Sequence, residues 1–271
     1  MTARTLDQLT RLARTHLDAS AQRWLGLLRP AVQLHPAAAG DPVLARLGGR
    51  PELPADTAWP QWPGLGPLAL IAEVDLAALT QTALDPGLVL PRQGRLLAFY
   101  FDDPDGVGAV VHSGDPDSLP GSRLLHVTGT GPAADPAVEL TGVQVLTWPD
   151  REHPVLADAG LDDPPDSFDA ALDELVEAEL GLDVWGHQLG GWAMPVQGTV
   201  EYEAAETRLG EGRYDAAHTA EALRWRPLLQ IDSDDAAGTS WGDEGCLYWL
   251  TRTDDDGVAG IHDVAFTWQC G

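Results

Sequence analysis

The sequence predicts an α+β protein that is rich in β-strands, with mostly antiparallel sheets built from two internally repeated halves. Short apolar runs separated by Pro- and Gly-containing turns fill most of the chain, which is typical of antiparallel sheet. Segments with helical periodicity occur near the N-terminus and near the middle. A set of short motifs also occurs twice in the same order, which indicates that the fold was assembled from two related units.

The N-terminal segment, residues 1–32, is assigned to a helix over residues 5–28. Its apolar residues recur at steps of three and four, which places them on one helix face: Leu6, Leu9, Ala13, Leu17, Ala21, Trp24 and Leu28. Pro30 ends the pattern because proline lacks the backbone N–H that a helix interior needs. We expect this helix to pack on the body of the protein, with docking to a partner as the alternative.

Residues 33–150 are predicted to form the first β-rich half. Its strand-like runs cover residues 68–74, 95–101, 109–112, 123–127 and 138–146. Asp85-Pro86-Gly87 is one of the turn sequences between them. Asp75 is a suitable N-cap for a short helix over residues 76–84.

Residues 151–180 are predicted to form a linker and a helix, and residues 181–271 the second β-rich half. The acidic, Pro-containing stretch 162–166 is the linker. Ser167 or Asp166 then caps a helix over residues 168–180, which Gly181 ends. The second half contains strand-like runs at residues 226–231, 246–251 and 264–269, preceded by a short helix over residues 216–224.

The internal repeat rests on residues 46–54, which match residues 188–195. Each copy precedes a Pro-Leu strand that ends in Asp, at Asp75 and Asp232, and then a strand with Gly and aromatic residues. The paired glycines Gly48-Gly49 and Gly190-Gly191 lack the remaining features of a dinucleotide-binding loop, so we interpret them as turns that need positive φ. Two such halves would pack around a pseudo-twofold axis and leave a seam between them.

Composition excludes several classes of function. Acidic residues number 42 and basic residues 16, which gives a net charge of −26 that repels nucleic acid and anionic membrane surfaces. All 16 basic residues are arginine, and the absence of lysine excludes a Schiff-base lysine, a pyridoxal-phosphate anchor and a P-loop. Cys246 and Cys270 are expected to be free thiols in a reducing cytoplasm. The charged N-terminus does not resemble a signal peptide, so we expect a soluble cytoplasmic protein.

The candidate site lies between Trp225 and Trp249, where carboxylates follow an apolar run that contains Gln230. Asp232, Asp234 and Asp243 are hard oxygen ligands that could gather around Ca²⁺ or Mg²⁺. An acidic surface loop is the main alternative, and with Asp235 the same carboxylates could instead anchor a cationic partner.

Two further residues belong to this candidate site, and each has an alternative role. Trp241 with Asp243 could present an indole and a carboxylate to a cation, or Trp241 could fill the core. His187 could act as an acid or base, or it could brace the glycine turn that follows it.

Several motifs together resemble the YwqG-like family, a bacterial family whose activity is not established. They are His187-Gln188-Leu189-Gly190-Gly191, Leu228-Leu229-Gln230-Ile231-Asp232, Trp241-Gly242-Asp243 and the closing Gln269-Cys270. The resemblance runs from Leu44 to the C-terminus, and it implies a cytoplasmic protein. It brings no catalytic residues, and Glu73 stands where the family pattern favours Gln.

These observations predict a non-enzymatic binding protein. It would engage a basic protein or peptide through an acidic, Trp-containing surface, and it would need no cofactor. A divalent-metal-dependent enzyme is the first alternative. A small-ligand-binding protein with its site at the seam between the two halves is the second, and it follows from the duplication alone.

Overall fold

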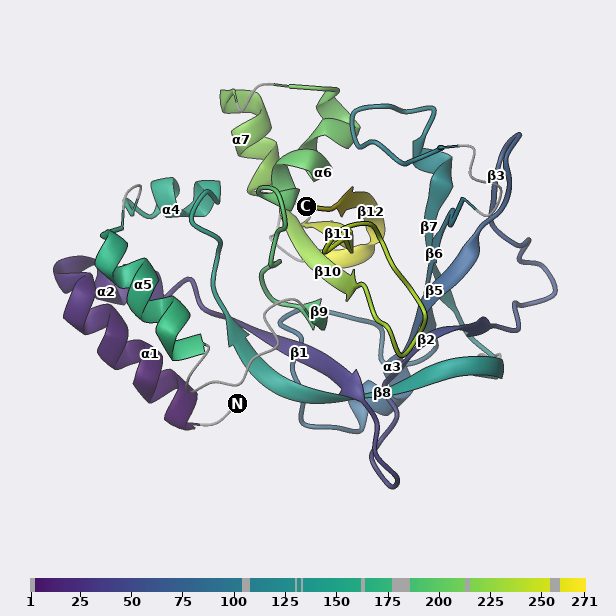
Figure 1. The fold of residues 1–271 in the computed structure, drawn as a ribbon, viewed down its shortest axis with the longest axis horizontal. Helices are drawn as coiled ribbons and strands as arrows, with labels where there is room; N and C mark the ends of the chain where they lie inside the picture. Colours follow the sequence, from purple (N-terminus) through teal and green to yellow (C-terminus); the bar gives the residue numbers. More distant parts are fainter. Residues whose placement is uncertain are drawn as a thin grey trace.

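The chain folds around one ten-stranded antiparallel sheet (Figure 1). A computed structural model describes residues 3–103, 108–129, 131–132, 134–161, 164–176, 186–212, 215–253 and 259–271. The strands of the sheet are β1 (Arg29–Pro36), β2 (Ala45–Arg50), β5 (Ala69–Asp75), β6 (Arg95–Tyr100), β7 (Ser122–Val127), β8 (Ala134–Thr147), β9 (His187–Gly190), β10 (Trp225–Asp232), β11 (Cys246–Thr253) and β12 (Ala259–Gln269). A separate ribbon contains β3 (Gln61–Trp62) and β4 (Gly66–Pro67).

The strand order places β1 and β8 at the centre of the sheet. On one side follow β9, β10, β11 and β12, and on the other β2, β5, β6 and β7. The sheet curls until its two edge strands, β7 and β12, approach each other, and it forms a nearly closed barrel (Figure 1). The predicted β-rich, antiparallel fold class is therefore confirmed.

Apolar side chains from strands on both sides of the central β1–β8 pair form the main core. Tyr100 of β6 stacks on Phe266 of β12, with ring centroids 5.1 Å apart. Trp249 lies beside Phe266 at 5.0 Å between ring centroids. Since aromatic rings bury large apolar areas, these contacts hold the curled sheet together.

The helices lie in separate groups around the sheet. At one end, α1 (Ala3–His16), α2 (Ala21–Leu25), α4 (Pro154–Asp158) and α5 (Asp166–Leu175) lie together (Figure 1). The others are α3 (Leu76–Thr80), α6 (Val200–Leu209) and α7 (Ala216–Ala222). No helix in the described ranges is long and apolar enough to span a membrane.

The single helix predicted over residues 5–28 is wrong. The structure has α1 and α2 with a 3₁₀ turn between them, at Asp18–Ser20. Asp18 has φ of 45°, a left-handed conformation that an α-helix does not accommodate. Of the predicted apolar face, Leu9 and Trp24 are buried in one cluster with Phe168 of α5, whereas Leu6 is exposed.

Other boundaries also differ from the prediction. Strand β1 begins at Arg29, where Pro30 indicated only the end of a helix, and residues 109–112 form no strand. Asp75 caps α3 as predicted, since its carboxylate accepts the N–H of Ala78 at 2.9 Å, but the helix ends at Thr80. Helix α5 begins at Asp166, so neither predicted residue caps it. The predicted helix end at 177–181 and residues 162–163 of the linker lie outside the described residues.

The paired glycines adopt positive φ, as predicted. The angles are 67° and 84° at Gly48 and Gly49, and 74° at both Gly190 and Gly191. Gly48 and Gly49 lie within β2 and Gly190 ends β9, so the left-handed residues bend strands and do not form isolated turns.

Candidate functional site

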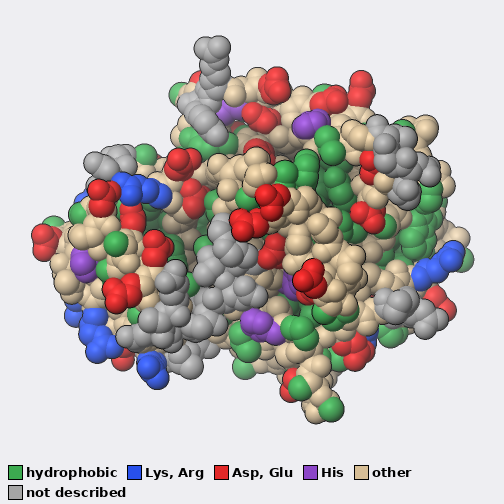
Figure 2. Space-filling view, in the orientation of Figure 1, with side chains coloured by type: hydrophobic (Ala, Val, Ile, Leu, Met, Phe, Trp, Pro, Cys, Tyr) green, Lys and Arg blue, Asp and Glu red, His purple; other side chains and the backbone are tan. Residues whose placement is uncertain are grey.

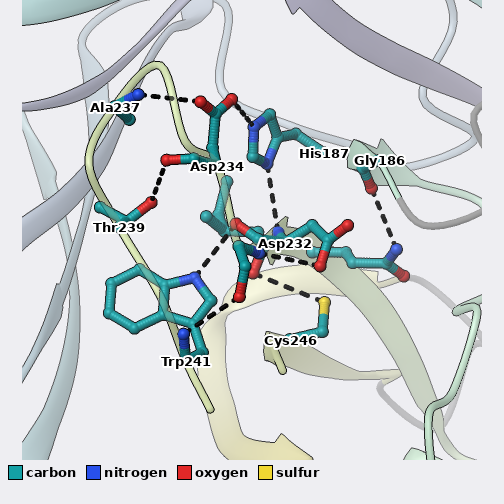
Figure 3. Close-up of polar contacts among 11 residues, drawn as sticks. Gly186, His187, Asp232, Asp234, Ala237, Thr239, Trp241 and Cys246 are labelled. Carbon is teal, nitrogen blue, oxygen red and sulfur yellow. Dashed lines mark hydrogen bonds and ion pairs between the residues drawn. The ribbon is translucent and has the colours of Figure 1, made fainter. Parts of the chain in front are cut away.

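The segment between β10 and β11, residues 233–245, folds into a turn that we call the acidic turn. One histidine of β9 binds to it through hydrogen bonds (Figure 3). His187 Nε2 lies 3.0 Å from Oδ2 of Asp234, and His187 Nδ1 accepts the backbone N–H of Asp232 at 3.1 Å. Because Nδ1 accepts, the proton of the neutral ring is on Nε2, which donates to the carboxylate. Both ring nitrogens of this buried residue are engaged, so His187 braces the acidic turn and not the glycine pair.

Asp234 is the centre of the turn. Its carboxylate also accepts the N–H of Ala237 at 2.8 Å, and its backbone exchanges two hydrogen bonds of 2.9 Å with Thr239. Burial alone would raise the pKa of Asp234, but the hydrogen bonds from His187 and Ala237 lower it below its usual value. Asp234 is therefore held as an anion inside the turn.

Trp241 points into the protein. Its side chain is buried, and its indole N–H donates to the backbone carbonyl of Asp232 at 3.1 Å (Figure 3). Its ring meets Tyr100 edge-on, with centroids 6.2 Å apart. Asp243, two residues later, is exposed. The indole and this carboxylate therefore do not share one surface.

Gln230 lies on β10, and its amide is buried. The amide donates to the carbonyl of Gly186 and accepts the N–H of Met194, both at 3.0 Å. Tyr248, its partner on β11, donates its hydroxyl to the carbonyl of Met194 at 2.8 Å. Gln230 and Tyr248 thus hold the segment around Met194, which follows β9, against the sheet.

Asp232 and Asp243, the other predicted metal ligands, and Asp235, predicted for a cationic partner, form no metal-holding group in the described part of the chain. Asp235 and Asp243 are exposed, and the carboxylate of Asp232 accepts the N–H of Ser233 at 2.8 Å. Over the described ranges, no group of three or more His, Cys, Asp or Glu side chains could hold a metal ion. Both cysteines are free, as predicted, and burial raises the pKa of the Cys246 thiol well above its usual value.

A cavity of about 630 Å³ lies between β7 and β12, where the curled sheet stays open; we call it the seam cavity. Figure 2 shows hydrophobic side chains in a hollow between the positions that these strands occupy in Figure 1. Seven large apolar side chains contribute to its lining: Leu119, Leu124, Trp225, Trp249, Ile261, Val264 and Phe266. Successive residues of both strands line the cavity, so it follows the two strand edges.

Three charged side chains also line the seam cavity. Arg208 of α6 forms an ion pair with Asp263 of β12, and its Nε lies 3.8 Å from Glu221 Oε1. Arg123 of β7 donates from Nη1 to the backbone carbonyls of Ser122 at 2.9 Å and Leu119 at 3.3 Å. Within the described part of the chain, Arg123 has these carbonyl partners and no carboxylate partner.

A second group of buried charges surrounds Trp192. Arg29 Cζ lies 3.2 Å from the centroid of the indole, and the His153 ring meets the same indole at 4.6 Å between centroids. Burial, followed by the charge of Arg226, lowers the pKa of Arg29 to about 9. His153 Nε2 lies 3.5 Å from Oε1 of the buried Glu201. These contacts link the α4 region to the sheet and to α6.

Sequence reasoning missed the residues of both the seam cavity and the Trp192 group. The sequence analysis predicted a seam where a ligand could bind, but it did not identify any of the side chains that line it. Of the seam residues, only Trp225 and Trp249 lie in the stretch that the sequence marked. The apolar runs at 123–127 and 264–269 were the available signal, but they predict strands and not a cavity.

The model of one protein family, described as a domain of unknown function (DUF1963), matches residues 45–270. No curated protein matches the chain. The match covers the sheet from β2 onward, the acidic turn and the whole of the seam cavity, and it leaves out α1, α2 and β1.

Proposed function

The chain belongs to the DUF1963 family, a domain of unknown function, and we propose from its geometry that it is a non-enzymatic binding protein with its ligand in the seam cavity. The observation that carries the proposal is the cavity of about 630 Å³ between β7 and β12. Small-molecule sites are concave, mostly apolar and roughly 300–1,000 Å³ in volume. The seam cavity has this size, and most of the residues that line it are apolar, while the surface that it exposes is more polar than apolar.

Binding is favoured over catalysis by the partners of the charged groups. At the cavity, Arg208 and Asp263 neutralise each other, and Arg123 donates to backbone carbonyls. At the acidic turn, His187 uses both ring nitrogens for structural hydrogen bonds. A general acid or base must exchange a proton with its substrate, and these groups are engaged elsewhere.

The arrangement of strands supports an origin by duplication. From the central pair outward, each side of the sheet runs through four strands in chain order. Arg46 pairs with Glu73 in register between β2 and β5, at the position where Gln188 pairs with Gln230 between β9 and β10. The seam would then be the junction between the last strands of the two repeats. The motifs that resemble the YwqG-like family lead us to infer a bacterial, cytoplasmic protein.

The test uses a neutral fluorescent probe, N-phenyl-1-naphthylamine, whose emission rises in apolar sites. Val264→Trp should fill the cavity and weaken probe binding at least about tenfold, which corresponds to about 1.4 kcal/mol. Val143→Trp is the matched control, because Val143 lies exposed on β8 away from the cavity. Equal binding by both variants and the unchanged protein would overturn the proposal.

The acidic turn supports a second candidate, the capture of a basic protein or peptide. The brace between His187 and Asp234 fixes the turn while Asp235 and Asp243 face solvent. The test is a pull-down from the lysate of the native host at low and moderate salt. A basic partner that is released as salt rises, and that Asp235→Arg with Asp243→Arg no longer captures, is expected. Asp7→Arg with Asp173→Arg is the control for net charge, and equal loss in both pairs would remove the turn from the proposal.

A further inference from the structure

The chemistry of the seam cavity specifies a ligand more closely than its volume does. Its inner lining includes the rings of Trp225, Trp249 and Phe266 together with Ile261 and Leu124. The part of a ligand that covers these side chains gains by removing apolar surface from water, so that part should be apolar. The head of the ligand then depends on the charges at the cavity.

One of the three charges at the cavity is uncompensated. Arg208 is paired with Asp263 and lies near Glu221, so this group attracts neither sign strongly. Arg123 meets only carbonyl oxygens among the described residues, and these carry no net charge. In the described part of the chain, Arg123 is therefore an exposed positive charge at the cavity with no carboxylate partner.

The geometry of Arg123 suits a carboxylate. Nη1 is held by the carbonyls of Ser122 and Leu119, which restrains the side chain at the β7 edge of the cavity. The planar guanidinium has five N–H donors in a fork, and it binds a carboxylate through two parallel hydrogen bonds. Nη2 and Nε donate no hydrogen bond to the described residues.

Resting on the proposed function, we propose that the seam cavity binds an apolar monocarboxylic acid, with its carboxylate on Arg123. The net charge of −26 makes this proposal easy to test, because the overall electrostatic field of the protein attracts cations and repels anions. A preference for an anionic head must therefore come from a local contact. Such a preference would distinguish a specific contact with Arg123 from attraction by the overall charge of the protein.

The experiment compares three probes with the same twelve-carbon chain: dodecanoate, dodecanol and dodecyltrimethylammonium. Binding to the full chain is measured by displacement of N-phenyl-1-naphthylamine and by quenching of tryptophan emission, below the concentration at which each probe forms micelles. We expect dodecanoate to bind about tenfold more tightly than dodecanol, since charge-assisted bonds are about twice as strong as neutral ones. In Arg123→Gln, the ratio of the two dissociation constants should fall to about one. Arg14→Gln, an exposed change on α1, should keep the ratio.

The outcomes separate this inference from the proposed function. If dodecanol binds as tightly as dodecanoate and Val264→Trp blocks both, the cavity binds ligands but the carboxylate inference is wrong. If dodecyltrimethylammonium binds most tightly, the general field decides and Arg123 does not. If no probe binds and Val264→Trp changes nothing, the proposed function fails and this inference fails with it.

Discussion

Trp249 of β11 donates its indole N–H to Oγ of Ser122 on β7, 3.0 Å away. The two strands lie near opposite edges of the ten-stranded sheet, so this bond closes the curled sheet from within. Both side chains also line the seam cavity. The cavity therefore has a fixed floor, made where the barrel closes, below an opening where β7 and β12 remain apart.

We expect the bond between Trp249 and Ser122 to couple the two strands energetically. Trp249→Phe removes the donor, while Ser122 keeps its own donation to the carbonyl of Phe99 at 3.1 Å. A neutral hydrogen bond contributes about 0.5–1.5 kcal/mol to the free energy of unfolding. The measurement is a double-mutant cycle with Ser122→Ala in urea, and a coupling of about 1 kcal/mol is expected. Additive losses would show that the bond does not join the edges.

The lowered pKa of Asp234 predicts a pH dependence of stability. The folded state holds this carboxylate ionised at a lower pH than the unfolded chain does, so its contribution is fully present above about pH 4. The contribution is lost as pH falls through the folded pKa. Asp234→Asn should therefore lower the free energy of unfolding by about 1 kcal/mol at pH 7, with the deficit shrinking toward pH 3. The exposed Asp235→Asn is the control, and a deficit in Asp234→Asn that is constant with pH would contradict the prediction.

Divalent cations are not expected to stabilise the protein. Ca²⁺ takes six to eight oxygen ligands, whereas Asp234 is committed to His187 and Ala237. At millimolar Ca²⁺ or Mg²⁺ we expect an unchanged melting temperature. A rise that Asp232→Asn cancels would restore the metal site that the sequence predicted.

Local sequence patterns were sufficient to predict the strands that contain an apolar run bounded by turn residues. The apolar run at 123–127 corresponds to β7, and the run at 138–146 lies within β8. Strand β1 was missed because Pro30 was interpreted only as the end of a helix. Its partners β8 and β9 lie far along the sequence, so nothing local indicates the pairing.

The candidate site shows the same limit. His187 and Asp234 both stood out in the sequence, but they are 47 residues apart, and only the pairing of β9 with β10 brings them together. The burial of Trp241 depends on Tyr100, which comes from the other side of the sheet. The seam cavity depends on how far ten strands curl, and no short motif encodes that curvature.

The last prediction concerns Gly190, at the end of β9, where the turn that contains Pro86 approaches closely. A Cβ on Gly190 would lie 1.8 Å from the carbonyl oxygen of Pro86, and Gly190 has φ of 74°. Gly190→Ala should therefore lower the free energy of unfolding by at least about 2 kcal/mol, from left-handed strain and a backbone clash. Gly198→Ala is the matched control, because no atom lies within 4 Å of its added Cβ, and a change within about 0.5 kcal/mol is expected in urea. If the two variants lose equal stability, the close approach of the Pro86 turn to β9 does not constrain the fold.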